Sequence, residues 1–317
     1  MTIKNIGIII GGATSQDTVN IDHAEDIGSV LAQDYQVEYY NVSKTDDIAR
    51  LMTDKLEGRL DIVFNNAAGK KGGDGTVEGI LEILDIPYVG SDTLATAVAF
   101  DKKTTKAVVS SAGVPIIKGI AVSLEEYKLN PSVIVQNITT SLGYPVVVKA
   151  SQGSDSIGIS LVKHARKLIP ALVRAFKEDS NVLVEEFIQR KAEVTCMVIG
   201  NGAKAHALEP VERVYQTELL YAQDISSRTY RIPELDQSIL EEIKRHSVVA
   251  HQALGCSDYS RSDFLVDQSG CVQFLELNGH AGLGRGGPTE FTAKITKGWD
   301  YEGLIREILQ VALARYK

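Results

Sequence analysis

Polar residues near the C-terminus alternate in a way that could hold a metal ion. Arg261 and Asp263 stand two positions apart, and Glu276 and Asn278 have the same spacing after a short turn. Because side chains alternate between the two faces of a strand, each pair shares a face. Carboxylate and amide oxygens suit a hard cation such as Mg²⁺, and an arginine beside them can stabilise negative charge that develops in a transition state.

The register of this hairpin decides whether the two pairs meet. An even-numbered turn centred on residues 268–269 would place Asp263 opposite Phe274 and Arg261 opposite Glu276, so that all these side chains project from one surface. The alternative is that these side chains form a solvent-exposed face of the hairpin, which is the usual interpretation of an isolated Glu-x-Asn pattern. Strongly apolar flanking residues and strict alternation of the polar set favour the metal site. An odd-numbered turn would break the shared face.

A lysine and a glycine-containing loop form a second group with a chemical use. Lys149 ends an apolar run that begins at Pro145, and the loop at 152–158 contains two glycines and several hydroxyl side chains. The backbone N–H groups of such a loop can bind phosphate oxygens, with the lysine as a point charge beside them. Gly/Ser loops are also common turns, and that alternative stays open.

Two further segments contain residue types that could bind a nucleotide, but the spacing of these residues is not specific to a nucleotide site. The apolar run at 182–185 continues through residues 186–188 and offers an edge for a purine base, with Glu193 available for ribose hydroxyls. An apolar strand that ends in acidic residues is equally an ordinary structural element. Lys102 stands at a predicted helix start, where a solvated lysine is the usual interpretation.

The elements that must position these groups begin with a small α/β lobe over residues 1–98. Strands and helices alternate there, which indicates a parallel sheet. The strands are predicted at 4–10, 37–40 and 60–65, and the helices at 21–33 and 75–84.

Two more lobes are predicted in the rest of the chain, a central one over residues 99–184 and a C-terminal one over 185–317. Their strands are predicted at 144–149, 159–162, 182–185, 193–199, 205–210, 262–267 and 271–277, and their helices at 101–112, 167–178, 235–254 and 299–316. The polar, tyrosine-rich stretch 212–232 shows little periodicity, so we predict a functional loop or lid there.

Composition excludes several classes of protein. The 317 residues are 44% hydrophobic, enough for two or three packed lobes. No apolar run approaches the roughly 20 residues of a membrane span, and the start lacks a signal peptide's cationic region, so we expect a globular cytoplasmic protein. Three widely spaced cysteines favour free thiols in a reducing compartment. A net charge of −8 without a long basic cluster disfavours nucleic acid as a partner.

Taken in chain order, these groups resemble the ATP-grasp superfamily and, within it, the D-alanine–D-alanine ligase family. The resemblance covers nearly the whole chain and depends on the order and spacing of the motifs. The motifs are Gly-Gly-Ala-Thr-Ser at 11–15, Gly-Asp-Gly-Thr-Val-Glu-Gly at 73–79, Ile-Pro-Tyr-Val-Gly-Ser at 86–91, Asp101-Lys102, the Lys149 strand, Gly153-Ser154, Glu185, Arg261-x-Asp263 and Glu276-x-Asn278. The resemblance implies an α/β fold with a Rossmann-like first lobe, ATP between the second and third lobes, and an amino-acid pocket between the first and third.

The resemblance also implies roles for individual residues. The nucleotide-binding residues would be Lys102 and Lys149 at the phosphates, Glu185 beside them, Glu186, Phe187 and Ile188 at the adenine, and Glu193 at the ribose. Asp263, Glu276 and Asn278 would hold two Mg²⁺ ions, for which Mn²⁺ can substitute, and Arg261 would face the reaction intermediates. Ser154 and Tyr221 would close the pocket.

The implied reaction is an ATP-dependent ligation of two amino acids. The first carboxylate attacks the γ-phosphate to give an acyl phosphate, and the amine of the second substrate then displaces phosphate, releasing ADP and phosphate overall. The implied partners are a small-molecule carboxylate, a small-molecule amine and a second copy of the chain in a homodimer. The alternatives are a family member that attaches an amino acid to a non-peptide acceptor, and a non-catalytic nucleotide-binding relative.

The substrate half of the sequence departs from the family pattern. Gln16 stands where the family has a glutamate for the first substrate's ammonium group, although the adjacent Asp17 could supply that charge. Ala68 stands where the family has a histidine near the pocket, and Leu220 stands where it has a lysine before the loop tyrosine. The loop after Lys149 is one residue longer than the family pattern.

The turn after Asn278 differs most. The family has a Pro-Gly-Met-Thr-like turn here, with a serine for the second substrate's carboxylate. This chain instead has Gly-His-Ala-Gly-Leu-Gly-Arg-Gly-Gly-Pro at 279–288. We therefore predict that the substrate pocket contains His280, Arg285, Gly286 and Gly287, with Arg285 as a bidentate carboxylate clamp. The alternatives are an exposed Arg285 on a glycine-rich loop and a structural hydrogen-bonding role for His280.

Overall fold

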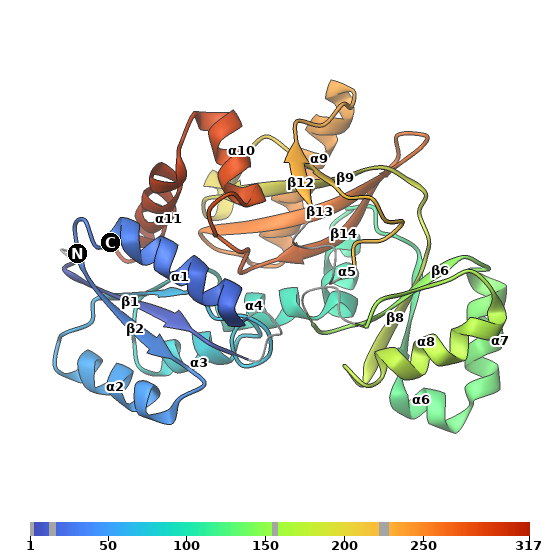
Figure 1. Ribbon diagram of the computed structural model, residues 1–317, viewed down its shortest axis with the longest axis horizontal. Helices are drawn as coiled ribbons and strands as arrows, with labels where there is room; N and C mark the ends of the chain where they lie inside the picture. Colours follow the sequence, from blue (N-terminus) through green and yellow to red (C-terminus); the bar gives the residue numbers. More distant parts are fainter. Residues whose placement is uncertain (1–2, 13–16, 154–157, 222–227) are drawn as a thin grey trace.

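Three β-sheets, each built from a different part of the chain, organise the protein (Figure 1). The computed structural model describes residues 3–12, 17–153, 158–221 and 228–317. The last helix, residues 301–315, returns to the first sheet. No helix in these described ranges is long and apolar enough to cross a membrane.

The first sheet is parallel in the order β2-β1-β3-β4, which confirms the prediction from alternating strands and helices. Ile6 and Ile8 of the central strand face the core around α1, and Ile9 faces the core around α2 and α3. Both faces are therefore covered, as a parallel sheet requires. Its elements are β1 (Asn5–Ile10), α1 (Asp17–Leu31), β2 (Gln36–Asn41), α2 (Thr45–Leu56), β3 (Ile62–Asn65), α3 (Thr76–Ile83) and β4 (Tyr88–Val89).

The middle sheet is antiparallel in the order β5-β8-β6-β7 and carries helices on one face only (Figure 1). Val146 and Val148 pack against those helices, whereas the alternate residues Val147 and Lys149 line a cavity on the opposite face. Its elements are β5 (Gly119–Ser123), α6 (Leu124–Leu129), α7 (Pro131–Ser141), β6 (Val146–Ala150), β7 (Ser160–Val162), α8 (Leu168–Ala175) and β8 (Asn181–Glu186).

The third sheet is antiparallel in the order β12-β11-β9-β13-β14, with β10 paired to β9. The helix α9 packs on one face, and α10 and α11 lead from this sheet back to the first. Its elements are β9 (Arg190–Ile199), β10 (His206–Ala207), β11 (Val211–Val214), β12 (Thr229–Arg231), α9 (Gln237–Ala253), β13 (Tyr259–Asp267), β14 (Val272–Asn278), α10 (Pro288–Lys297) and α11 (Tyr301–Arg315).

Two helices, α4 (Thr93–Phe100) and α5 (Lys102–Ser111), connect the first sheet to the middle one. Asp101 caps α5 by accepting a hydrogen bond from the Thr104 N–H at 2.8 Å, which satisfies one of the free amides of the first turn. Although α5 precedes the middle sheet in sequence, Val109 packs with Phe264 and Phe274 of the third sheet. The start of this helix therefore lies between two sheets.

The register of the β13–β14 hairpin differs from the expected one. Asp263 lies opposite Glu276 and Arg261 opposite Asn278, while Phe264 lies opposite Phe274. Asp263 and Phe264 are neighbours on β13, but their partners on β14, Glu276 and Phe274, are two positions apart. At this irregularity the regular alternation of side chains between the two faces of β14 is broken. The polar pairs still share a face, but Phe274, which was expected on that face, packs in the core on the other side of the sheet.

Several short elements were not predicted from the sequence, among them α2, α4, α7, α10 and β5. The helix α2 buries only Leu51 and Asp54, and most of its twelve residues are polar, so its sequence contains few apolar residues that would indicate a helix. The strand predicted at 205–210 is reduced to β10, and the stretch 212–232 contains β11 and β12 at its ends. Residues 222–227 of that stretch lie outside the described residues.

Candidate active site

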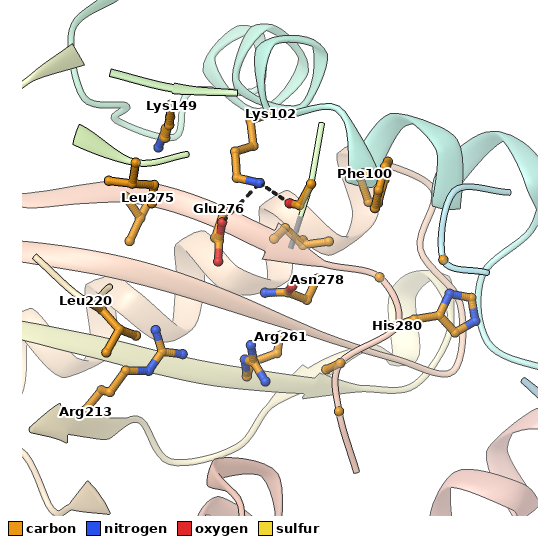
Figure 2. Close-up of a pocket in the computed structure, with 18 of the residues that line it drawn as sticks. Phe100, Lys102, Lys149, Arg213, Leu220, Arg261, Leu275, Glu276, Asn278 and His280 are labelled. Atoms are coloured by element: carbon orange, nitrogen blue, oxygen red, sulfur yellow. Dashed lines mark hydrogen bonds and ion pairs between the residues drawn. The ribbon is translucent and has the colours of Figure 1, made fainter. Parts of the chain in front are cut away.

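A cavity of about 340 Å³ takes its lining residues from all three sheets. At one end it is lined by Lys149 of the middle sheet, and at the other by Asn65 of the first sheet. Between them stand Glu276 and Asn278 of β14, and Figure 2 shows these two side chains beside Lys102. The cavity thus brings together basic, acidic and amide groups that lie far apart in the sequence.

Lys102 lies in the first turn of α5, and the chain around it is fixed to the end of β6. Its backbone N–H donates to the Ser151 carbonyl at 2.9 Å, and the Ser151 hydroxyl donates to Asp101 at 3.1 Å. The ammonium group then donates to the Gly153 carbonyl at 2.7 Å and lies 3.7 Å from the Glu276 carboxylate. Glu276 is 31% exposed, so it remains accessible from the cavity.

Glu185 is a fully buried carboxylate held between two lysines. Lys149 Nζ lies 2.6 Å from Glu185 Oε2, and Lys106 forms an ion pair with Oε1. Burial alone would raise the pKa of Glu185, but attraction to the two lysines outweighs it, and the pKa is lowered. Burial also lowers the pKa of Lys106 to about 8, despite Glu185. The carboxylate thereby orients Lys149 at the cavity wall.

A second buried network connects Glu193 with Asp263 through Arg213. One guanidinium nitrogen of Arg213 lies 2.5 Å from Glu193 and another 3.1 Å from Asp263. Arg261 approaches the other oxygen of Asp263 at 3.4 Å, and the Tyr215 hydroxyl donates to Glu193. Burial would raise the pKa of Asp263, but Arg213 and Arg261 lower it, so the carboxylate stays ionised.

The three residues expected to hold metal differ in their availability. Glu276 and Asn278 line the cavity, and the amide nitrogen of Asn278 is buried without a hydrogen-bond partner among the described residues. Their carboxylate and amide oxygens fit a hard divalent ion. Asp263 is 0% exposed and already bound by two arginines. Within the described ranges no group of three or more His, Cys, Asp or Glu side chains is arranged to hold a metal ion.

The opposite end of the cavity contains His280, which contacts a buried carboxylate. His280 Nε2 lies 3.2 Å from Glu78 Oε1, and Asn65 donates to the same oxygen at 2.5 Å. Burial raises the pKa of Glu78 despite the nearby histidine. Gly90 leaves room for this ring, since a Cβ there would lie 2.9 Å from His280 Nε2. Figure 2 shows His280 on the chain that follows Asn278.

Arg285 is not among the residues that line the cavity, and it has other partners. Its Nε atom lies 3.2 Å from Asp26 Oδ1, and its guanidinium stacks over the Tyr301 ring at 4.3 Å. Gly286 donates its N–H to Glu290 at 2.7 Å, and Gly287 caps α10. This turn therefore connects α1, which contains Asp26, with α10, the helix that follows it.

The remaining predicted residues divide into two groups. Most line the cavity, including Lys102, Lys149, Glu185, Glu186, Phe187, Ile188, Glu193, Arg261, Glu276, Asn278 and His280. Tyr221 directly follows Leu220, which lines the cavity. Gln16 and Ser154 lie outside the described residues, and Asp17 begins α1 without a described side chain.

Sequence reasoning missed several residues of this site. Lys106 could have been found, because it lies one helical turn after Lys102 and so faces the same way. Asn65 ends a parallel strand, and ligands bind at the carboxyl ends of such strands. Arg213 and Arg228 carried no local signal, since both lie in the stretch without periodicity.

Comparison with known proteins identifies the family. Residues 108–310 match the family described as D-ala D-ala ligase C-terminus. The D-alanine–D-alanine ligase of Pelotomaculum thermopropionicum is 33% identical, over 99% of this chain and 98% of its own. That of Carboxydothermus hydrogenoformans is 34% identical, over 97% and 98% respectively. The chain belongs to the D-alanine–D-alanine ligase family.

Solved structures agree with this assignment. The D-alanine–D-alanine ligase of Bacillus anthracis, solved in complex with ATP, has a TM-score of 0.82 at 26% identity and covers 98% of both chains. The VanG D-Ala:D-Ser ligase of Enterococcus faecalis has a TM-score of 0.83 at 24% identity, covering 98% of this chain and all of its own, and supports the fold alone. The expected ATP-grasp fold is therefore confirmed.

We expect Glu185→Gln to lower the free energy of unfolding by about 3–5 kcal/mol, because it leaves two buried lysines without a counter-charge. Glu186→Gln is the matched control from the same strand. Its ion pair with Lys118 is solvent-exposed and should contribute less than about 1 kcal/mol. Urea unfolding of the ligand-free variants measures both values, and equal destabilisation would contradict the role given to the buried carboxylate.

Proposed function

We propose that the protein uses ATP to join two amino acids, activating the carboxylate of one as an acyl phosphate that the amine of the other attacks. The observation that carries this proposal is the meeting of Lys102 and Lys149 with Glu276 and Asn278 around one cavity. Phosphoryl transfer depends chiefly on positioning and charge neutralisation, and these groups supply both. Membership in the D-alanine–D-alanine ligase family supports the reaction class.

The nucleotide would lie along the middle sheet. Lys102 and Lys149 would hold its phosphates, residues 186–188 would contact the adenine, and Glu193 would accept ribose hydroxyls. A divalent ion such as Mg²⁺, bound by Glu276 and Asn278, would neutralise negative charge on the terminal phosphates. Among the described residues Arg261 makes one long contact, with Asp263, so the rest of its guanidinium is available to the negative charge that develops on the oxygens of the reacting carboxyl group.

Arg228, rather than Arg285, is our candidate for the carboxylate of the amine substrate. Arg228 lines the cavity, and in the described part of the chain no ion pair joins it to a carboxylate. Burial lowers the pKa of its guanidinium, and the charges of Arg213 and Arg261 act in the same direction. An anionic ligand would relieve this repulsion. Arg285 already has Asp26 as a partner.

We further propose that the protein is a cytoplasmic homodimer. Its cysteines are free thiols, with Cys196 and Cys256 buried, which suits a reducing compartment. The dimer is an expectation from the family resemblance.

Purified protein with Mg²⁺ and ATP should release ADP when a panel of D- and L-amino acid pairs is supplied, and mass spectrometry should detect the dipeptide. Glu276→Gln should lower kcat by on the order of 100-fold or more, because a neutral amide holds the divalent ion that neutralises the terminal phosphates more weakly than a carboxylate does. Glu218→Gln, which alters another cavity carboxylate, should change kcat little, since its partner Lys163 is exposed. ATP binding without turnover on any pair, including non-peptide acceptors, would favour a non-catalytic relative.

Arg228→Met should raise the KM for the amine substrate found by that panel at least tenfold, and should change the KM for ATP less. The matched variant Arg285→Met should leave the KM for the amine within about twofold of the unmodified protein, because its partners lie outside the cavity. Steady-state kinetics with each substrate varied in turn measures these constants. A larger effect at Arg285 than at Arg228 would restore the glycine-rich turn as the carboxylate clamp.

A further inference from the structure

Arg213 of β11 occupies an unusual position between two carboxylates of the proposed nucleotide site. Its side chain is 6% exposed, and those of Glu193 and Asp263 are 5% and 0% exposed. The guanidinium reaches the cavity wall while bonding to both acids, at 2.5 Å and 3.1 Å. This one cation thus connects the residue proposed for the ribose with a residue expected to hold metal.

The geometry around Asp263 conflicts with direct metal binding. Mg²⁺ needs oxygen ligands at about 2.0–2.1 Å in a nearly octahedral arrangement. Asp263 directs one oxygen to Arg213 and the other to Arg261, and none of its surface is exposed. A metal ion could reach this carboxylate only after a buried arginine had left it. Leaving would in turn deprive Glu193 of its ion pair.

The two ligands on β14 have no such obstacle. Glu276 is 31% exposed and lies 3.7 Å from Lys102, a distance too long for a strong hydrogen bond. Asn278 also lines the cavity, where its amide oxygen is the atom that could bind an ion. Figure 2 shows the side chains of Glu276 and Asn278 adjacent, with Arg213 and Arg261 on the other side of them from Lys102. The expected metal ligands on β14, Glu276 and Asn278, are therefore available to an ion, whereas Asp263 on β13 is not.

We infer that this protein binds a single divalent ion with its nucleotide, at Glu276 and Asn278, and that the Arg213 guanidinium replaces a second ion at Asp263. The inference rests on the proposed function, because it concerns the nucleotide complex. Arg213 acts as a positioning residue, fixed by Asp263 and Glu193 rather than by the substrate. A guanidinium keeps its charge at any physiological pH and is not lost to a chelator, unlike a bound ion.

The number of bound ions tests this inference directly. Protein saturated with the non-hydrolysable ATP analogue AMP-PNP is titrated with Mn²⁺, and electron paramagnetic resonance of the free ion gives the number bound per chain. We expect one Mn²⁺ in the unmodified protein, without the spin coupling of two ions about 3.5–4 Å apart. We expect two in Arg213→Met, because the variant frees Asp263 and leaves an uncompensated negative charge.

Arg228→Met is the matched control, since it removes another cavity arginine that has no carboxylate partner among the described residues, and it should bind one ion. Two ions in the unmodified protein would overturn the inference, whether or not Arg213→Met folds. So would an Arg213→Met variant that binds AMP-PNP with one ion. Failure of the unmodified protein to bind AMP-PNP would instead overturn the proposed use of ATP, and the inference with it.

Discussion

Buried carboxylates that must be paired with cations govern the arrangement of this cavity. Glu185 lies between Lys106 and Lys149, while Asp263 and Glu193 share Arg213. A carboxylate without its counter-charge is strongly unfavourable in the protein interior, so each acid constrains the cations around it. The pairing fixes where the basic side chains point before a nucleotide is bound. Pre-organised charges of this kind are what phosphoryl transfer requires, since they need not reorient during the reaction.

The fold brings these charges together by placing strand ends and one helix start at a common point. The alternation of β6 buries valines on one face and directs Lys149 to the other. The helix α5 is fixed at its start to the end of β6, and it packs along its length against the third sheet. Lys102 consequently reaches Glu276 across the boundary between two sheets. The position of the ammonium group thus depends on tertiary packing as much as on the helix itself.

The sequence predicted the parts of this site that depend on local pattern. The alternation of side chains along a strand correctly predicted that Arg261, Asp263, Glu276 and Asn278 share a face. The alternation of strands and helices correctly predicted the parallel sheet. The hairpin register was wrong because an irregularity beside Phe264 depends on core packing, which no turn length reveals. Arg213 lies 20 residues from Glu193 and 50 from Asp263, and Arg285 lies 259 residues from Asp26, so only the folded chain shows these pairs.

We propose that cationic and acidic groups from different sheets meet around the terminal phosphates of ATP. A crystal structure with AMP-PNP and Mg²⁺ tests it most directly. We predict the terminal phosphate within hydrogen-bond distance of Lys102 and Lys149, with an ion bridging it to Glu276 and Asn278. Electron density that places the triphosphate elsewhere, or leaves Glu276 and Asn278 turned away from it, would contradict the account.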